Sequence, residues 1–164
     1  MAVTIDDIDE GDLPDPFQEG LDGFRDAHPL QEVEVVIGVG NFVVVSLGMF
    51  RLGKYNEDTN GRELEYTHDA VEVFARLPRN WPEWSGENAK GFGTAPALQR
   101  SNRGIQLNSN WNAGVEQQTA EAIDQSVEFY SWGWDPNNAP GVPMEEPEDL
   151  KYAYDLAVEM LQHG

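Results

Sequence analysis

The feature that most constrains the fold is a long stretch of β-branched and other apolar residues with Gly40-Asn41 near its centre. Over residues 33–50 it reads Val-Glu-Val-Val-Ile-Gly-Val-Gly-Asn-Phe-Val-Val-Val-Ser-Leu-Gly-Met-Phe. A Gly-Asn pair between two such runs is typical of a two-residue hairpin turn. The stretch therefore predicts two antiparallel strands, at about residues 33–39 and 42–52.

Two other interpretations of this stretch are weaker. Gly38-Val39-Gly40 matches the start of a dinucleotide-binding loop, but the third glycine of that motif is absent. Residues 35–50 carry no charge, but they are fewer than the roughly 20 residues that a membrane-spanning helix needs. We therefore expect strands here, and no membrane contact.

Weaker periodicities predict two more strands. Apolar residues alternate loosely from Glu63 onwards and predict a third strand that ends at Pro78, with a short helix over residues 69–77 as the alternative. Alternation resumes over residues 120–132 and predicts another strand.

The best helix signal lies at the C-terminal end. Pro147 and the acidic residues after it are typical of a helix N-terminus, and the pattern predicts a helix over residues 147–163. This helix is apolar around most of its circumference, so we expect it to be buried on more than one side, across the sheet and against another subunit. The predicted fold class is α+β, an antiparallel β-sheet with the C-terminal amphipathic helix packed on it.

The first 28 residues form an acidic arm, and residues 29–164 are predicted to form a single domain. Asp15-Pro16-Phe17-Gln18 is typical of a helix start, and Phe17, Leu21 and Phe24 follow at helical spacing. Gly20 and Gly23 weaken this short amphipathic helix, so it needs a surface to dock on. That surface is either the chain's own body or a neighbouring subunit.

Residues 78–114 are rich in Pro, Gly, Asn, Ser and Trp and predict a long irregular loop. Around it, five basic residues at 76–103 oppose two glutamates, a local charge of +3, whereas residues 1–26 hold nine acids and one arginine, a charge of −8. We expect the arm to lie on residues 76–103 of an adjacent copy, a head-to-tail contact that closes into rings or extends into tubes. The candidate interface residues are Phe17, Leu21, Phe24, Arg76, Arg79, Arg100, Arg103, Trp81, Trp84 and Trp111.

The five tryptophans have two interpretations. They stack on sugars in a carbohydrate-binding loop, or they anchor loops to the core and to other subunits, which is the interpretation that we favour.

The composition indicates a halophilic protein. Thirty Asp and Glu oppose ten Lys and Arg, a net charge of −20, and the chain has no cysteine. In molar salt the Debye length falls to about 3 Å, so the self-repulsion of this charge is screened. The absence of cysteine excludes disulfides, thiolate metal sites and cysteine nucleophiles. Because the first residues lack a secretory signal pattern, we expect synthesis in the cytoplasm.

Catalytic and metal-binding motifs are not evident. His28, His68 and His163 lack metal-ligand spacing, and the chain has no nucleophile elbow or phosphate-binding loop. Asn56-Glu57-Asp58-Thr59-Asn60-Gly61 imitates the start of an EF-hand loop, but Thr67 occupies the position of its last ligand. A hairpin turn at Asn60-Gly61 is the better interpretation. We therefore predict no catalytic residues, no cofactor and no metal site.

In size, acidic composition and hairpin-plus-C-terminal-helix layout, the whole chain resembles the small neck and tail proteins of tailed viruses, in a version adapted to halophilic archaeal hosts. This resemblance implies a non-enzymatic virion protein that forms rings or tubes with copies of itself and with neighbouring virion proteins. DNA would meet it only by passing through a ring, and a small-molecule ligand is not expected. The alternatives are a capsid decoration protein, a carbohydrate or host-surface binding module that uses the Trp-rich loop, and a small enzyme with carboxylates, in which a divalent ion binds near Asp58 or Asp135.

Overall fold

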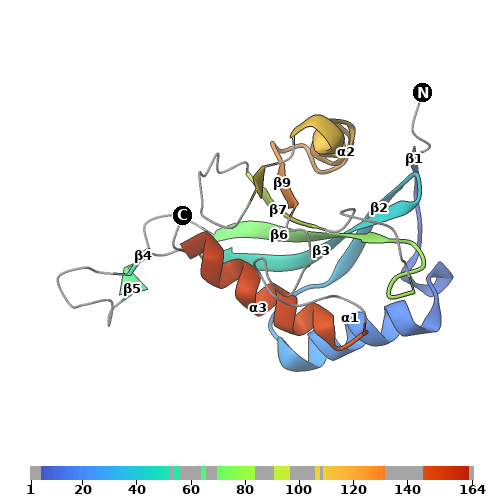
Figure 1. Cartoon of the computed structure of the whole chain (residues 1–164), viewed down its shortest axis with the longest axis horizontal. Coiled ribbons are helices and arrows are strands. Elements are labelled where there is room, and N and C mark those ends of the chain that lie inside the picture. The colour runs from blue at the N-terminus through green and yellow to red at the C-terminus, as the bar shows by residue number, and fades with distance from the viewer. Residues whose placement is uncertain are drawn as a thin grey trace.

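The computed structural model describes residues 5–51, 54–55, 64–65, 70–83, 91–96, 106–107, 109–131 and 146–162. Within these ranges the chain forms three α-helices and an antiparallel β-sheet, which is the α+β fold that the sequence predicts. Helices α1 (Asp15–Ala27) and α3 (Asp149–Gln162) lie together on one side of the sheet, and α2 (Ser109–Ile123) lies on the other (Figure 1).

In the described part of the chain, seven strands form the main sheet, and every neighbouring pair is antiparallel. Two short strands, β4 (Lys54–Tyr55) and β5 (Leu64–Glu65), pair separately as the arms of a hairpin would, but the turn predicted at Asn60-Gly61 lies outside the described residues. The main sheet has the order β1 (Ile5–Asp6), β2 (Glu34–Val39), β3 (Phe42–Arg51), β6 (Ala70–Pro78), β7 (Gly91–Ala95), β9 (Glu128–Ser131) and β8 (Gln106–Leu107).

The predicted central hairpin is confirmed as β2 and β3. Val39 pairs with Phe42 across the turn, and Gly40 has the positive φ of 59° that such a two-residue turn requires. The third predicted strand is confirmed over Ala70–Pro78 as β6, so the alternative of a helix there is wrong, whereas Leu64–Glu65 at its predicted start belong to β5 in the separate pair. Strand β3 also carries a bulge between Ser46 and Met49, where Gly48 has a φ of 90°.

Both faces of the central strands are buried, which explains the nearly continuous apolar run in the sequence. Val43 and Val45 face α1 and α3, whereas Val44 between them faces the α2 side. On β6, Val73 and Phe74 divide between the same two sides. The structure is thus a three-layer arrangement with a core on each side of the sheet.

Helices α1 and α3 confirm the two predicted amphipathic helices. Helix α1 begins at Asp15, after Pro14, one residue earlier than the predicted start. Because α1 packs in the same core as α3 and the sheet, the division of the chain at residue 28 into an arm and a domain is corrected. The buried residues of α3 are Leu150, Ala153, Tyr154, Ala157 and Val158.

The predicted loop at residues 78–114 is wrong in part, because it contains β7, β8 and the start of α2. Strand β7 escaped prediction because its Gly-rich sequence imitates a loop. Gly93 in this strand is required by close packing, since a Cβ there would lie 2.5 Å from the carbonyl oxygen of Glu128.

The strand predicted over residues 120–132 is also corrected. Residues 120–123 end α2, and only Glu128–Ser131 form a strand, β9. Val115, Thr119 and Ile123 recur every four residues and belong to one helix face, which starts inside the Asn-rich segment. The helix ends where Asp124 adopts a left-handed φ of 57° and the N–H of Gln125 donates to the carbonyl oxygen of Ala120 at 3.2 Å.

Candidate interaction surface

The apolar anchors of the acidic arm are part of the chain's own core. Phe17, Leu21 and Phe24 are fully buried between α1, α3 and the sheet. The rings of Phe24 and Tyr154 meet edge to face at 4.9 Å between centroids. The prediction that these three residues dock on an adjacent copy is therefore corrected, because the docking surface is the chain's own body.

For Trp81 the interpretation as a core anchor is confirmed, and its prediction as an interface residue is corrected. Its side chain is fully buried and meets the ring of Phe17 edge to face, with centroids 5.3 Å apart. A sugar cannot stack on a ring that is buried in this way. Trp84 lies outside the described residues, and for Trp111 in α2 only the backbone is described.

Arg79 is paired within the chain. Its guanidinium group binds the carboxylate of Asp6, and its Nε donates to the carbonyl oxygen of Gly40 at 2.8 Å. These bonds tie β1 to the turn between β2 and β3. The acidic arm and the basic segment after β6 thus do meet, as their opposite charges predict, but they meet within one chain.

Arg76 is also unavailable as a surface contact. It lies on β6 with 5% of its surface exposed, and its guanidinium carbon is 3.9 Å from the centroid of the Phe42 ring. Burial lowers the pKa of Arg76 to about 10. Arg76 therefore does not line an interface or a DNA channel, and Arg100 and Arg103 lie outside the described residues.

Helix α3 presents apolar side chains to solvent as well as to the core. Tyr152 and Leu156, one turn apart, are 52% and 39% exposed. The Nζ of Lys151 lies 5.2 Å from the centroid of the Tyr152 ring. This pair agrees with the prediction that the helix has apolar surface beyond what the sheet covers.

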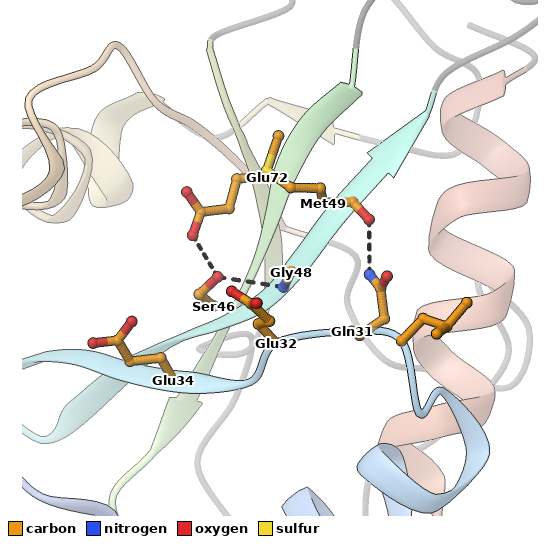
Figure 2. Close-up of a pocket in the computed structure, with 8 residues that line it drawn as sticks. Gln31, Glu32, Glu34, Ser46, Gly48, Met49 and Glu72 are labelled. Carbon is orange, nitrogen blue, oxygen red and sulfur yellow. Dashed lines mark hydrogen bonds between the residues drawn. The ribbon is translucent and has the colours of Figure 1, made fainter.

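Gln31, in the connection between α1 and β2, holds together three parts of the fold. Its Nε2 lies within hydrogen-bond distance of the carbonyl oxygens of Leu47 and Met49, at 3.0 and 2.8 Å, on either side of Gly48 in the bulge of β3. The same atom is 3.2 Å from the hydroxyl oxygen of Tyr154 on α3. Gln31 therefore fixes the connection against both the sheet and the last helix. Figure 2 shows its bond to Met49.

An acidic cavity of about 460 Å³ opens on one side of this connection. The hydroxyl of Ser46 donates to Oε2 of Glu72 at 2.5 Å and accepts the N–H of Gly48 at 3.3 Å. Figure 2 shows the carboxylates of Glu32, Glu34 and Glu72 around Ser46. This cavity lies on the sheet face opposite α1 and α3, because Glu34 pairs with Ser46 next to Val44.

A mainly apolar groove of about 390 Å³ opens on the other side of the connection. Here Nε2 of His28 is 3.0 Å from Oδ1 of Asp155. Burial, followed by the charge of Asp155, raises the pKa of Tyr154 to about 12. Leu30 and Gln31 line both spaces, and Leu30 is 94% exposed. The other residues that line the groove are Ala27, Pro29, Phe50 and Val158.

Sequence reasoning missed the residues around this connection. Leu30 and Gln31 belong to neither the amphipathic pattern of α1 nor the alternation of β2, so no periodicity marks them. The available signal is a lone leucine in the short polar connection His28-Pro29-Leu30-Gln31, where burial is not expected.

Two further observations concern metals and membranes. In the described ranges, no group of three or more histidine and acidic side chains is arranged to hold a metal ion. None of the helices in the described part of the chain has the length and apolar character needed to cross a bilayer.

Comparison with known proteins does not assign the chain to a family. No protein-family model, no curated protein and no solved structure matches it.

Proposed function

We propose that this protein is a non-enzymatic structural subunit of a multi-subunit assembly in concentrated salt. The specific form that we propose is a neck or tail protein of a tailed virus with a halophilic archaeal host. The observation that carries the proposal is the outer side of α3, where Tyr152 and Leu156 are exposed, although Leu150, Ala153, Tyr154, Ala157 and Val158 of the same helix are buried in the core. Apolar side chains that lie one turn apart on the same exposed helix face offer a surface that another subunit can cover.

Salt favours contacts of this kind. The net charge of −20 opposes association of copies in dilute buffer, and this repulsion is screened at molar ionic strength. The free energy gained by burying apolar surface does not fall when charges are screened, and salts that are excluded from the protein surface increase it. We therefore expect copies of the chain to associate through the outer side of α3 in high salt.

The interface differs from the one that the sequence predicts. Phe17, Leu21 and Phe24 are buried in the core, and Arg79 is paired with Asp6, so these four residues do not supply the contact. The burial of Arg76 likewise removes one of the basic candidate interface residues. The proposed assembly therefore rests on α3.

Sedimentation velocity and electron microscopy of the full chain in molar KCl test this proposal. The expected result is a closed ring of fixed copy number. A chain that sediments as a monomer at every concentration, in molar KCl and alone, would contradict assembly with copies of itself.

A further inference from the structure

The acidic cavity and the apolar groove open on opposite sides of the connection between α1 and β2, and they form two halves of one surface that crosses this connection, because Leu30 and Gln31 line both. Gln31 is held by Leu47, Met49 and Tyr154, so the wall between the two halves is fixed. Leu30 lies in the same connection, next to Gln31, and its side chain is almost fully exposed. A single short segment of polypeptide can therefore contact both halves across Leu30.

No described residue with a positive charge lines the acidic half. Its described lining consists of Leu30, Gln31, Glu32, Glu34, Ser46, Gly48, Met49 and Glu72. Elsewhere in the described residues, arginines neutralise carboxylates: Arg25 binds Glu10 and Asp22, and Arg79 binds Asp6. Glu72 instead accepts from the buried hydroxyl of Ser46, which orients a carboxylate without neutralising it.

The apolar half offers contact area for a hydrophobic anchor. Phe50, Val158 and Pro29 line it, and His28 and Asp155 form its polar rim. This combination of an apolar pocket with a polar rim is typical of peptide-binding sites.

We propose that this surface binds a segment of a companion protein, with an apolar side chain in the groove and a nearby arginine or lysine among Glu32, Glu34 and Glu72. The inference rests on the proposed function, since a subunit of an assembly needs a docking site for the protein next to it. Charge complementarity identifies the occupant as basic.

A second copy of this chain fits the surface less well. The chain has 30 acids against ten basic residues, so a copy brings mainly negative surface to an acidic cavity. Of its four described arginines, Arg25 and Arg79 already bind carboxylates and Arg76 is buried, whereas Arg51 is exposed at the end of β3. The overall charge of the chain therefore favours a different protein as the basic partner.

The two halves have separate roles in brine. Screening weakens ion pairs between exposed groups, so the carboxylates mainly select the partner. Burial of the apolar anchor against Leu30 and Phe50 supplies most of the affinity, because it does not depend on screening.

A peptide-display selection on the immobilised full chain in molar KCl tests the proposal. The probe is a library of random 12-residue peptides. The expected peptides combine an aliphatic or aromatic residue with arginine or lysine.

Synthetic versions of the selected peptides should bind the Leu30→Ser variant at least about tenfold more weakly than the parent chain, since burial of one leucine side chain changes affinity by about this factor. Binding to the double variant Glu32→Gln/Glu34→Gln should weaken about fivefold, as expected for two exposed ion pairs.

Two control variants match these changes away from the surface. Leu156→Ser removes an exposed leucine from α3, and Glu121→Gln/Glu148→Gln removes the same charge from exposed positions. Both controls should bind the peptides as the parent chain does.

Three outcomes would overturn the inference: selected peptides without basic residues, peptides that bind the site variants and the controls equally, or no selected peptide that depends on Leu30. A dimer of the chain that Leu30→Ser dissociates would assign the surface to a second copy instead. The sedimentation experiment reports assembly independently, so failure of the peptide site and failure of the proposed assembly are distinguishable.

Discussion

The indole ring of Trp81 lies directly against the backbone of Gly20, in the space that a side chain would occupy. A Cβ at Gly20 would be 2.5 Å from Cζ3 and 2.6 Å from Cη2 of Trp81. The residue that weakens α1 as an isolated helix is therefore the one that allows α1 to approach the segment after β6. Helix propensity and tertiary packing make opposite demands at this position.

Gly20→Ala should destabilise the protein, although alanine is the better helix former. The added methyl group displaces a fully buried indole, and such overpacking costs about 2 kcal/mol. Gly23→Ala on the same helix is the matched control. A Cβ there meets no atom within 4 Å. This variant should be stabilised by about 0.5 kcal/mol. Chemical denaturation in molar KCl measures both, and equal effects of the two changes would contradict the role of Trp81.

Arg79→Lys should release β1 from the sheet. Lysine retains the charge but loses the Nε donor to Gly40 and the planar fork that holds Asp6. Because the pair is partly exposed, global stability should fall by less than about 1 kcal/mol. Hydrogen exchange should become faster at residues 5–6 and 38–40. Arg25 binds Glu10, Asp22 and the carbonyl oxygen of Val33, so Arg25→Lys should instead affect residues 10–12 and 33; the same exchange pattern in both variants would refute a local effect.

Glu116 on α2 should make stability depend on pH in an unusual direction. It accepts the N–H of Phe129 at 3.0 Å. Burial, and then the charge of Glu128, raise the pKa of Glu116, although the Phe129 bond opposes the rise. The folded state holds the proton of Glu116 more tightly than the unfolded state. The contribution of this group to folding stability is therefore fully present at pH values below the ordinary glutamate pKa, and it is lost as the pH rises through the pKa of Glu116 in the folded state.

Glu116→Gln keeps the acceptor oxygen and removes the charge. It should match or exceed the parent's stability at neutral pH, by less than about 1 kcal/mol because the group is partly exposed. The difference should vanish in acid, where the parent's Glu116 is protonated. Glu116→Ala leaves the Phe129 N–H without this acceptor and should cost about 1 kcal/mol. Denaturation series at several pH values measure these effects, with exposed Glu121→Gln as the control.

Tyr152→Ser/Leu156→Ser should dissociate the proposed assembly and leave the fold intact, because both side chains are exposed in the single chain. Sedimentation velocity in molar KCl should then report a monomer with an unchanged circular dichroism spectrum. Leu30→Ser is the matched control and should leave the assembly unchanged. If the assembly persists without Tyr152 and Leu156, the contact between copies does not lie on the outer side of α3.

The sequence predicts the elements whose signals are local. The turn at Gly40-Asn41, the 17-21-24 spacing of α1 and the start at Pro147 each determine structure from a few neighbouring residues. The prediction for strand β7 is wrong because Gly93 is required by its contact with Glu128 and Phe129 on a neighbouring strand, which the local sequence does not show. The prediction for helix α2 is wrong because its first residues lie in an Asn-rich segment that is typical of a loop.

The candidate site could be predicted only in part. Opposite charge correctly pairs the arm with the segment around Arg79, but charge alone does not say whether two segments meet within one chain or between two chains. The Leu30–Gln31 surface depends on contacts of Gln31 with β3 and α3, which lie far away in the sequence.

The packing of α1 against α3 also sets the order of folding. Gln31 and Tyr154 are separated by 123 positions, and Asp6 and Arg79 by 73. During synthesis the apolar face of α1 leaves the ribosome long before α3, which covers it, so α1 cannot complete its packing until α3 has been made. A nascent chain that stops short of α3 leaves Phe24 without its contact to Tyr154, and the core forms fully only after α3 has been synthesised.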